Sequence, residues 1–269
     1  MLIRLPDIWQ ISKPDQYKLH FARRSGITQP LEVLARSKLE WQGWQEYRPK
    51  RDEFNRPLIF SLVQFYHEPD TWLFGGVFRV LRRHDDRYEV ELTDEGAALC
   101  GRLKLKSDYR QRATRVNFES HYPNLIVNEI LREHYTGTPF PGFENIDLTF
   151  EELETIVQNS QPEWKAPLAN IKGIYLVTDT ATGKRYVGSA YSDQGIYSRW
   201  CEYASSGHGG NAELVPIVIK MGLEYCRKSF RFTLLEARSV ATPDDTIFSR
   251  ESFWKQILLT RGEFGLNRN

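Results

Sequence analysis

Short apolar runs separated by polar turns dominate residues 58–105. The runs are rich in β-branched and aromatic residues and cover Leu58 to Tyr66, Trp72 to Leu81, Tyr88 to Leu92 and Leu103 to Leu105. Several short strands at this spacing are typical of a small antiparallel sheet or barrel. Gly75 and Gly76 lie within the second run and predict a sharp bend. The first part of the chain is therefore expected to be β-rich.

Helical patterns flank these runs. Pro30 to Leu39 has apolar residues near helical spacing behind a proline suited to a first turn, and Asn124 to His134 has a similar period. Thr149 and Glu152 form a capping-box pair that begins another short helix. The segment before Gly26 has no clear period, so we expect irregular structure or short helices there.

A hairpin pattern follows in the last hundred residues. Ile171 to Thr178 and Lys184 to Gly188 are β-branched and aromatic runs, and a polar turn separates them. Gly173 and Gly188 then lie within strands, where glycine indicates a bulge or a close approach of another group. Beyond the hairpin we expect a helix, a buried apolar segment of undetermined type, a strand and a long final helix, at Tyr197 to Ser205, Ala212 to Met221, Arg231 to Glu236 and Asp244 to Arg261.

The two patterns are separated by a polar segment. Asn159 to Pro167 contains two prolines and little periodicity, which is typical of a linker. We therefore divide the chain into domains at 1–165 and 166–269. The fold class predicted is α+β: an N-terminal β-rich sheet or small barrel with helices, followed by a small antiparallel sheet flanked by helices.

Composition adds few constraints. The chain has 269 residues, 41% of them hydrophobic and 26% charged, with a net charge of +1. From Ile171 onward there are 13 Lys and Arg against 10 Asp and Glu, whereas residues 1–170 hold 23 against 25. A balanced total can hide a basic face, so nucleic acid is neither required nor excluded as a partner.

The sequence shows neither a membrane-spanning run nor a signal-peptide pattern, and this bears on cellular location. No apolar run approaches the roughly 20 residues of a membrane span, and the start of the chain does not resemble a signal peptide. We expect a cytoplasmic protein with no membrane partner. The cysteines Cys100, Cys201 and Cys226 are widely spaced and odd in number, so free thiols are expected rather than disulfides or a zinc site.

Two features of the first domain are open to two interpretations. A basic stretch, in which alternation places three cations on one strand face, is either a solvated strand face or charged sheet edge, or a stripe that follows phosphates; it comprises Arg102, Lys104, Lys106, Arg110, Arg112 and Arg115. An aromatic-rich set forms either the core of a small barrel or a pocket that stacks on a base; it comprises Trp41, Trp44, Tyr47, Phe60, Phe65, Tyr66, Trp72, Phe74 and Phe78.

The candidate chemistry lies in the second domain. Tyr175 and Tyr186 are predicted to face the same side of the hairpin, which by itself is more typical of a core than of a catalytic site. Arg199 and Tyr203 are four residues apart on the next helix and therefore share a face. Glu251 lies on the final helix in a Glu-x-x-Trp-Lys setting, and Gly-Leu-Asn ends at Asn267.

In this order the residues resemble the GIY-YIG nuclease family. The matching pattern is Gly173-Ile174-Tyr175, then Tyr186-Val187-Gly188, Arg199, Glu251 and Asn267, and it covers roughly the last hundred residues. The resemblance implies that the glutamate binds a divalent metal, Mg²⁺ with Mn²⁺ as an alternative. It further implies that the arginine contacts the scissile phosphate, that a motif tyrosine positions or deprotonates the attacking water, and that the asparagine holds the geometry.

This chain departs from the family pattern at two positions. Some relatives have histidine where Tyr203 stands, and others have lysine where Ser189 stands. A phenol with its ordinary pKa near 10 is a poor base at neutral pH, so the proton's route through Tyr175, Tyr186 or Tyr203 stays open. Lys184 is a candidate phosphate contact on the hairpin.

The hypothesis is a metal-dependent endonuclease that hydrolyses DNA phosphodiesters, double-stranded DNA being favoured. The first domain would select the target, because a small catalytic module has little surface for reading sequence. A restriction-like or phage-defence role is favoured, and cutting both strands would suit a homodimer. The alternatives are a DNA-repair nuclease, an RNA-directed nuclease, and a nucleic-acid-binding protein that has lost activity.

Overall fold

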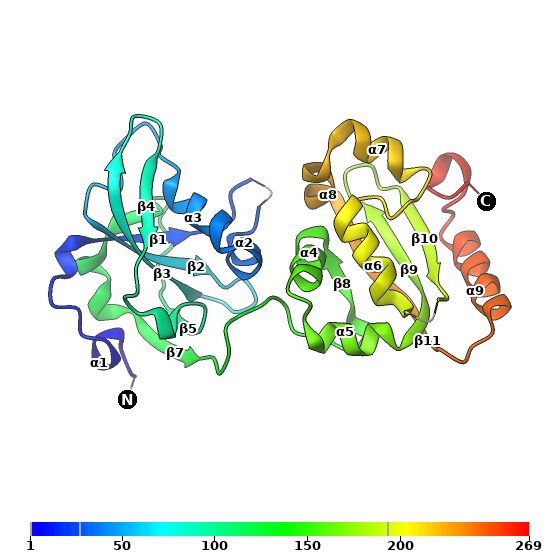
Figure 1. Cartoon of the computed structure of the whole chain (residues 1–269), viewed down its shortest axis with the longest axis horizontal. Helices are drawn as coiled ribbons and strands as arrows, with labels where there is room; N and C mark the ends of the chain where they lie inside the picture. Colours follow the sequence, from blue (N-terminus) through cyan, green and yellow to red (C-terminus); the bar gives the residue numbers. More distant parts are fainter. Residues whose placement is uncertain (1, 27, 193, 269) are drawn as a thin grey trace. The chain divides into compact units, whose positions relative to one another are not determined.

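The structure, a computed structural model, describes residues 2–26, 28–192 and 194–268. It divides into two compact units, one up to Tyr135 and the other from Thr136 (Figure 1). Both units combine helices with a sheet, which confirms the α+β class. The segment predicted as a linker instead holds helix α5 (Pro162–Ala169), in which Trp164 is fully buried. The division between the two units thus lies well before residue 165, where the sequence pattern placed it.

The first unit is built on a mixed sheet. Its path is β6-β1-β2-β3-β5-β7, with β4 pairing with β3 beside the path. Strands β1 and β2 run parallel, so the sheet is not the purely antiparallel one predicted. The strands are β1 (Tyr17–Ala22), β2 (Leu58–Gln64), β3 (Thr71–Arg83), β4 (Tyr88–Leu92), β5 (Leu103–Lys106), β6 (Arg115–Asn117) and β7 (Ile126–Ile130). The apolar runs predicted as strands are confirmed as β2 to β5, whereas β1 was missed.

One predicted helix is a strand. Residues 124–134 contain β7, which pairs antiparallel with β5, Ile126 lying opposite Lys106 and Val127 opposite Leu105. The helix prediction was wrong because the period was weak over so short a segment. Residues 126–130 form a strand because the backbone N–H and C=O groups of β5 pair with them. A local sequence pattern carries no information about such a distant partner.

The glycine pair in β3 has a steric cause. The register between β2 and β3 shifts at Gly75, which is the bulge expected there. A Cβ at Gly75 would lie 2.6 Å from the Trp41 ring, and the Trp41 indole N–H donates to the Gly75 carbonyl at 2.8 Å. The bulge therefore opens the strand to a buried tryptophan.

Short helices cover this sheet. The helix predicted from Pro30 ends at Arg36, and Ser37 then caps a further helix by accepting a hydrogen bond from the Glu40 N–H at 3.2 Å. The helices are α1 (Leu5–Ile8), α2 (Pro30–Arg36) and α3 (Lys38–Glu46), with single 3₁₀ turns at Pro14–Gln16, Ala97–Leu99, Phe118–Ser120 and Tyr122–Asn124. The sequence pattern missed α3.

The aromatic-rich set is mainly core. Its buried members are at most 6% exposed and belong to two hydrophobic clusters of this unit; they are Trp41, Phe60, Phe65, Trp72, Phe74 and Phe78. A base cannot stack on rings whose faces are already covered by protein. The base-binding interpretation is therefore wrong for these six side chains.

The second unit is built on an antiparallel sheet in the order β10-β9-β11-β8, which confirms the prediction for this part. The strands are β8 (Asp147–Thr149), β9 (Ile171–Asp179), β10 (Arg185–Ala190) and β11 (Phe230–Ser239). The helices are α4 (Phe150–Gln158), α5, α6 (Gly195–Ser206), α7 (Leu214–Met221), α8 (Leu223–Ser229) and α9 (Asp244–Ile257), with 3₁₀ turns at Phe143–Asn145 and Gly262–Phe264.

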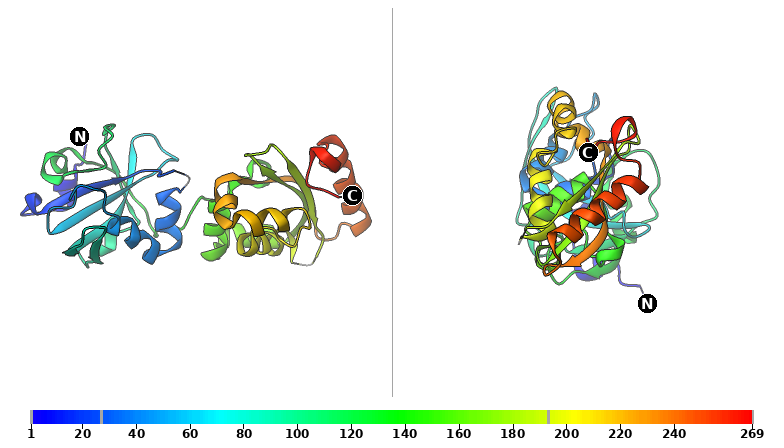
Figure 2. Two further views of the ribbon diagram at one scale, coloured as in Figure 1. Left: turned by 90° about the horizontal axis from the view of Figure 1, so that it is seen from above. Right: turned by 90° about the vertical axis from the view of Figure 1, so that its right-hand side faces the viewer.

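Alternation along β9 assigns the two faces of this sheet. Tyr175 and Val177 belong to the large cluster that includes Trp200 of α6, while Ile174 packs with Ile247 of α9. Helices α6 and α9 therefore cover opposite faces, as Figures 1 and 2 show. Strand β10 lies at the end of the strand order, so among the residues that the structure describes no strand pairs with its outer edge.

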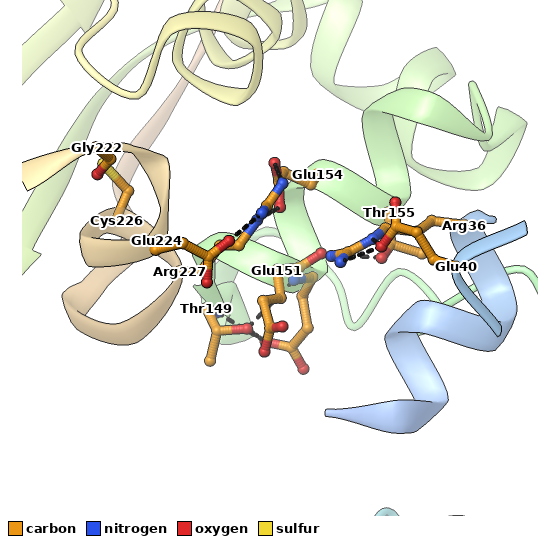
Figure 3. Close-up of polar contacts among 11 residues, drawn as sticks. Arg36, Glu40, Thr149, Glu151, Glu154, Thr155, Gly222, Glu224, Cys226 and Arg227 are labelled. Atoms are coloured by element: carbon orange, nitrogen blue, oxygen red, sulfur yellow. Dashed lines mark hydrogen bonds and ion pairs between the residues drawn. The ribbon is translucent and has the colours of Figure 1, made fainter. Parts of the chain in front are cut away.

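Hydrogen bonds and ion pairs hold helices α4 and α8 in place. Thr149 caps α4 and Glu152 reaches back to the Thr149 N–H at 2.7 Å, which confirms the predicted capping box. Arg227 of α8 donates to both carboxylate oxygens of Glu154 at 2.7 and 2.9 Å, and it also contacts Glu224 (Figure 3). Because Glu154 is 3% exposed, this bidentate pair satisfies a charge that would otherwise be costly to bury.

Unfolding of the first unit should depend on pH through His20. Burial first, and then the charge of Arg115, lowers the pKa of His20 to about 3, against 6.5 for an exposed histidine. Its stabilising contribution is complete above pH 6.5 and is lost as the pH falls towards 3, because only the unfolded chain takes up the proton. From pH 8 to pH 5 the free energy of unfolding should fall by about 2 kcal/mol from this residue, as measured in urea.

The matched variant is His20→Gln, which does not titrate and can still bond to Gln45. Its free energy of unfolding should lack this part of the pH dependence. An equally steep fall in the variant would contradict the assignment to His20.

Candidate active site

Backbone groups on the outer edge of β10 are partly hydrogen-bonded by Leu266 and Asn267. The Asn267 side chain accepts from the Val187 N–H and donates to the Val187 carbonyl, both at 2.9 Å. The Leu266 N–H donates to the Arg185 carbonyl at 2.8 Å. Asn267 is 6% exposed, so its amide completes the hydrogen bonds of an edge strand where water has little access.

Both strand glycines have the reasons expected of them. A Cβ at Gly188 would lie 2.5 Å from the Tyr175 hydroxyl, because the Tyr175 ring lies across Gly188. A Cβ at Gly173 would lie 2.3 Å from the Glu236 carbonyl oxygen, beside the register shift between Leu234 and Glu236. Because glycine has no side chain, Gly188 leaves room for the Tyr175 ring and Gly173 leaves room for the bulged backbone of β11.

The motif tyrosines share one face, as predicted. Gly188 pairs with Tyr175 and Tyr186 pairs with Val177, so Tyr175 and Tyr186 are diagonal neighbours with ring centroids 6.4 Å apart. Tyr203 of α6 lies edge-on to Tyr175 at 5.8 Å, and their hydroxyl oxygens are 3.3 Å apart. Tyr175 and Tyr203 are fully buried, while Tyr186 is half-buried.

Arg199 is held by these two phenols. Its Nε–H donates to the Tyr175 hydroxyl at 3.0 Å, and its guanidinium carbon lies 5.4 Å from the centre of the Tyr203 ring. Its terminal NH1 contacts Glu202, whose side chain is 54% exposed. Because an exposed ion pair is weak, the outer side of the guanidinium fork can exchange Glu202 for another anion.

Burial decides which phenol is a candidate base. Burial, more than any neighbouring charge, raises the pKa of Tyr175 and of Tyr203 well above the ordinary value of 10. Both therefore stay protonated at neutral pH, and their hydrogen bonds serve to orient Arg199. Tyr186 is the motif tyrosine that borders open space.

Both oxygens of the Glu251 carboxylate have partners. The Ser189 hydroxyl donates to Oε2 at 2.6 Å, and the Lys255 ammonium lies 2.9 Å from Oε1. Sequence reasoning did not assign Ser189 or Lys255 to the site. Lys255 follows Glu251 by four residues, a spacing that predicts a shared helix face. The family pattern marks position 189, but its contact with Glu251 follows only from the fold.

A partly buried ion cluster fixes α9, and with it Glu251, against the sheet. Glu236 of β11 accepts from Trp254 Nε1 at 2.8 Å, from Arg250 Nε at 2.7 Å and from Arg238 Nε at 2.9 Å. Burial alone would raise the pKa of Glu236, but the bonds from Arg250, Arg238 and Trp254 prevail and lower it to about 2. The carboxylate thus stays charged across the physiological range and anchors the helix.

A hollow of about 480 Å³ along β10 brings three of the predicted residues together. Tyr186, Arg199 and Glu251 all line it, although they come from a strand and from helices on opposite faces of the sheet. Its other lining residues are Ser189, Ala190, Tyr191, Ser192, Ser198, Glu202 and Phe248. We call it the edge hollow.

The remaining predicted residues lie around the edge hollow. Tyr175 and Tyr203 are buried beneath Arg199, and Asn267 lines a neighbouring hollow of about 310 Å³. That second hollow is also lined by Tyr186, Arg199 and Lys255, so the two spaces share a wall.

The donor atoms of the edge hollow suit a hard divalent cation. Glu251, Ser189 and Glu202 offer carboxylate and hydroxyl oxygens, which are the ligand types that Mg²⁺ takes, usually alongside several waters. Within residues 2–26, 28–192 and 194–268, no group of three or more His, Cys, Asp or Glu is arranged to hold a metal. A single carboxylate anchor at Glu251 is compatible with this, since Mg²⁺ is often bound through one or two carboxylates.

The basic stretch of the first unit is not a continuous stripe. Lys104 is 5% exposed, and its ammonium binds Glu68 at 2.6 Å and Glu129 at 2.9 Å. β5 lies between β3 and β7, so the edge interpretation is wrong as well. Lys104 thus stabilises the interior of its unit and is not accessible to a phosphate.

The other predicted phosphate contacts are scattered. Arg102 donates to the carbonyls of Leu131 and Ala98, and Arg110 pairs with Asp70 at 2.6 Å while remaining largely exposed. The remaining members are exposed and lie on separate segments; they are Lys106, Arg112 and Lys184. No shared face of β5 presents them together in the described part of the chain.

Replacing Gly188 with alanine should distort the site from within. The new Cβ would press on the buried Tyr175 ring, which has no room to retreat, so the free energy of unfolding should fall by about 1–3 kcal/mol. Gly43→Ala in α3 is the control, since a Cβ there meets nothing within 4 Å and should stabilise its helix by about 0.5–1 kcal/mol. Chemical denaturation of both variants provides the measurement. Unchanged stability of Gly188→Ala would contradict the packing described.

The chain was compared with known proteins. No protein-family model matches it, and no curated protein is similar to it. Among the helices of the described residues, none combines the length and apolar character needed to cross a membrane. Among solved structures, the catalytic domain of homing endonuclease I-TevI is similar at 28% identity, covering 36% of this chain and 98% of that domain with a TM-score of 0.28. A point mutant of the catalytic domain of intron endonuclease I-TevI is similar at 26% identity, covering 37% of this chain and 94% of the mutant with a TM-score of 0.29.

Proposed function

We propose that this chain is a divalent-metal-dependent endonuclease that hydrolyses phosphodiester bonds of DNA. One observation carries the proposal: Tyr186, Arg199 and Glu251 line the same hollow at the edge of β10. These are the residues to which the GIY-YIG resemblance gives the water, the phosphate and the metal. They lie far apart in sequence, and the fold brings them to one open space.

Arg199 is suited to hold the scissile phosphate. Its Nε is fixed by Tyr175, and its outer nitrogens face the exposed Glu202, which a phosphate would displace. A guanidinium fork matches two phosphate oxygens, and its charge is most effective where water is scarce.

Glu251 is suited to hold Mg²⁺ or Mn²⁺, with Ser189 orienting its carboxylate. The chemistry expected of such an ion is relief of the negative charge on the phosphoryl oxygens and on the leaving oxygen. Tyr186 borders the same space, and its hydroxyl is the one best placed to hold the attacking water. Asn267 keeps β10 in place through both of its bonds to Val187.

The first unit is proposed to select the target. Three catalytic side chains in one small hollow offer little surface for reading sequence, so selectivity must come from elsewhere in the chain. A restriction-like or phage-defence role fits a nuclease with a separate selecting unit. A homodimer would provide a second site for the second strand.

The decisive experiment is cleavage of plasmid DNA in Mg²⁺ by the full chain and by Glu251→Gln. We expect the wild type to cut and the variant to lose at least about 100-fold in rate, because the carboxylate that anchors the cation is gone. Glu163→Gln, an exposed glutamate on α5, should cut like the wild type.

The same assay separates the alternatives. Cleavage of RNA in preference to DNA would indicate an RNA-directed nuclease, and preference for damaged or branched DNA would indicate repair. Binding without cleavage across all substrates would indicate an inactive binding protein and overturn the proposal. Equal cleavage by Glu251→Gln would overturn the role given to the metal.

Arg199→Lys tests the role of the guanidinium. Lysine keeps the charge but loses the bond from Nε to Tyr175 and the second donor to phosphate. Cleavage should fall by about 10- to 100-fold, while DNA affinity, measured without metal, changes less than about threefold. Turnover at the wild-type rate would remove Arg199 from the site.

A further inference from the structure

The edge hollow contains two side chains that the proposed chemistry does not use. Tyr191 and Phe248 are 47% and 42% exposed, and both line the hollow with Arg199 and Glu251. Their rings meet edge to face, with centroids 4.9 Å apart and planes inclined at 78°. We call these two side chains the aromatic pair.

The positions of the pair are set by the same elements that set Glu251. Phe248 precedes Glu251 by three residues on α9, a spacing that puts both on one helix face. Tyr191 follows Ser189 by two residues at the end of β10. The aromatic pair thus continues the Ser189–Glu251 contact along the hollow.

Packing does not account for the pair. Neither ring belongs to the hydrophobic clusters of this unit, whereas Trp200 and Tyr203 of α6 and Tyr175 of β9 are buried in the largest of them. The two adjacent rings leave about half of their surface in water beside a polar hollow, and covering that apolar surface with a partner is favourable. The neighbouring lining atoms include the hydroxyl groups of Ser192 and Ser198, which can donate to or accept from the edge of a planar polar ring.

We propose that Tyr191 and Phe248 form a corner that holds an unpaired DNA base next to the scissile phosphate, one ring stacking on the face of the base and the other contacting its edge. This inference rests on the proposed nuclease function. Within a duplex the faces of a base are covered by its neighbours, so a stacking side chain needs a base that is single-stranded or turned out of the helix. A hollow of about 480 Å³ is within the range of about 300–1,000 Å³ that small-molecule sites occupy. The substrate is therefore DNA with an unpaired nucleotide at the cut.

The test measures binding without metal, so that it does not depend on cleavage. Fluorescence anisotropy compares a labelled 20-nucleotide single strand with its 20-base-pair duplex, using the full chain in EDTA. The variants are Tyr191→Leu and Phe248→Leu, which keep apolar volume but lack a ring. We expect each to bind the single strand at least about fivefold more weakly, and to change duplex affinity less than about twofold.

Phe253→Leu is the matched control. Phe253 lies on the same helix and is 43% exposed, but it does not line the edge hollow. Its replacement should leave both affinities unchanged. Tyr191→Phe and Phe248→Tyr keep the rings and should retain single-strand binding, and thermal melting of every variant establishes that it is folded.

The outcomes separate this inference from the nuclease proposal. Equal losses for single strand and duplex, or no loss in either, would overturn the stacking role even if plasmid DNA is cut. Absence of DNA binding and of cleavage by the wild type would instead overturn the nuclease function on which the inference rests. A selective loss in the two leucine variants, absent in Phe253→Leu, would support it.

Discussion

The arrangement of the site depends on how the backbone N–H and C=O groups along the outer edge of β10 are hydrogen-bonded. An edge strand exposes N–H and C=O groups, and each such group left unpaired in a buried place costs about 1–3 kcal/mol. Asn267 satisfies both groups of Val187, so no further strand is needed there. Beyond Val187 no strand of the described residues pairs with this edge of β10, and side chains from both faces of the sheet line one hollow there. A further strand at this edge would have separated Arg199 from Glu251.

In the proposed site, Tyr175, Tyr186 and Tyr203 have different roles because they are buried to different extents. Tyr175 and Tyr203 are buried and protonated, so their hydroxyls act as a fixed support that aims Arg199. Tyr186 is the member of the set that reaches open space. Three chemically identical side chains thus take two different tasks because the sheet and α6 cover them to different extents.

The second unit was largely predictable because its signals are local. The hairpin, its two glycines, the capping box at Thr149 and the last helix each depend on residues close in sequence. Ser189 and the ion cluster at Glu236 could not be foreseen, since they require the register of β9 with β10 and β11. In the first unit the same limit explains the errors: β7 and the burial of Lys104 both depend on partners supplied by distant strands.

The contact between Lys255 and Glu251 has a consequence for the ion selectivity of the proposed metal site. The protein neutralises its own carboxylate with an ammonium group at 2.9 Å, so an incoming cation competes with a tethered one for the same oxygen. A monovalent ion such as Na⁺ or K⁺ carries no more charge than the ammonium it would displace and gains little. A small divalent ion has twice the charge and binds oxygen more strongly, so it can win the exchange. In the proposed enzyme, Lys255, one helical turn from Glu251, would thereby discriminate against monovalent salts.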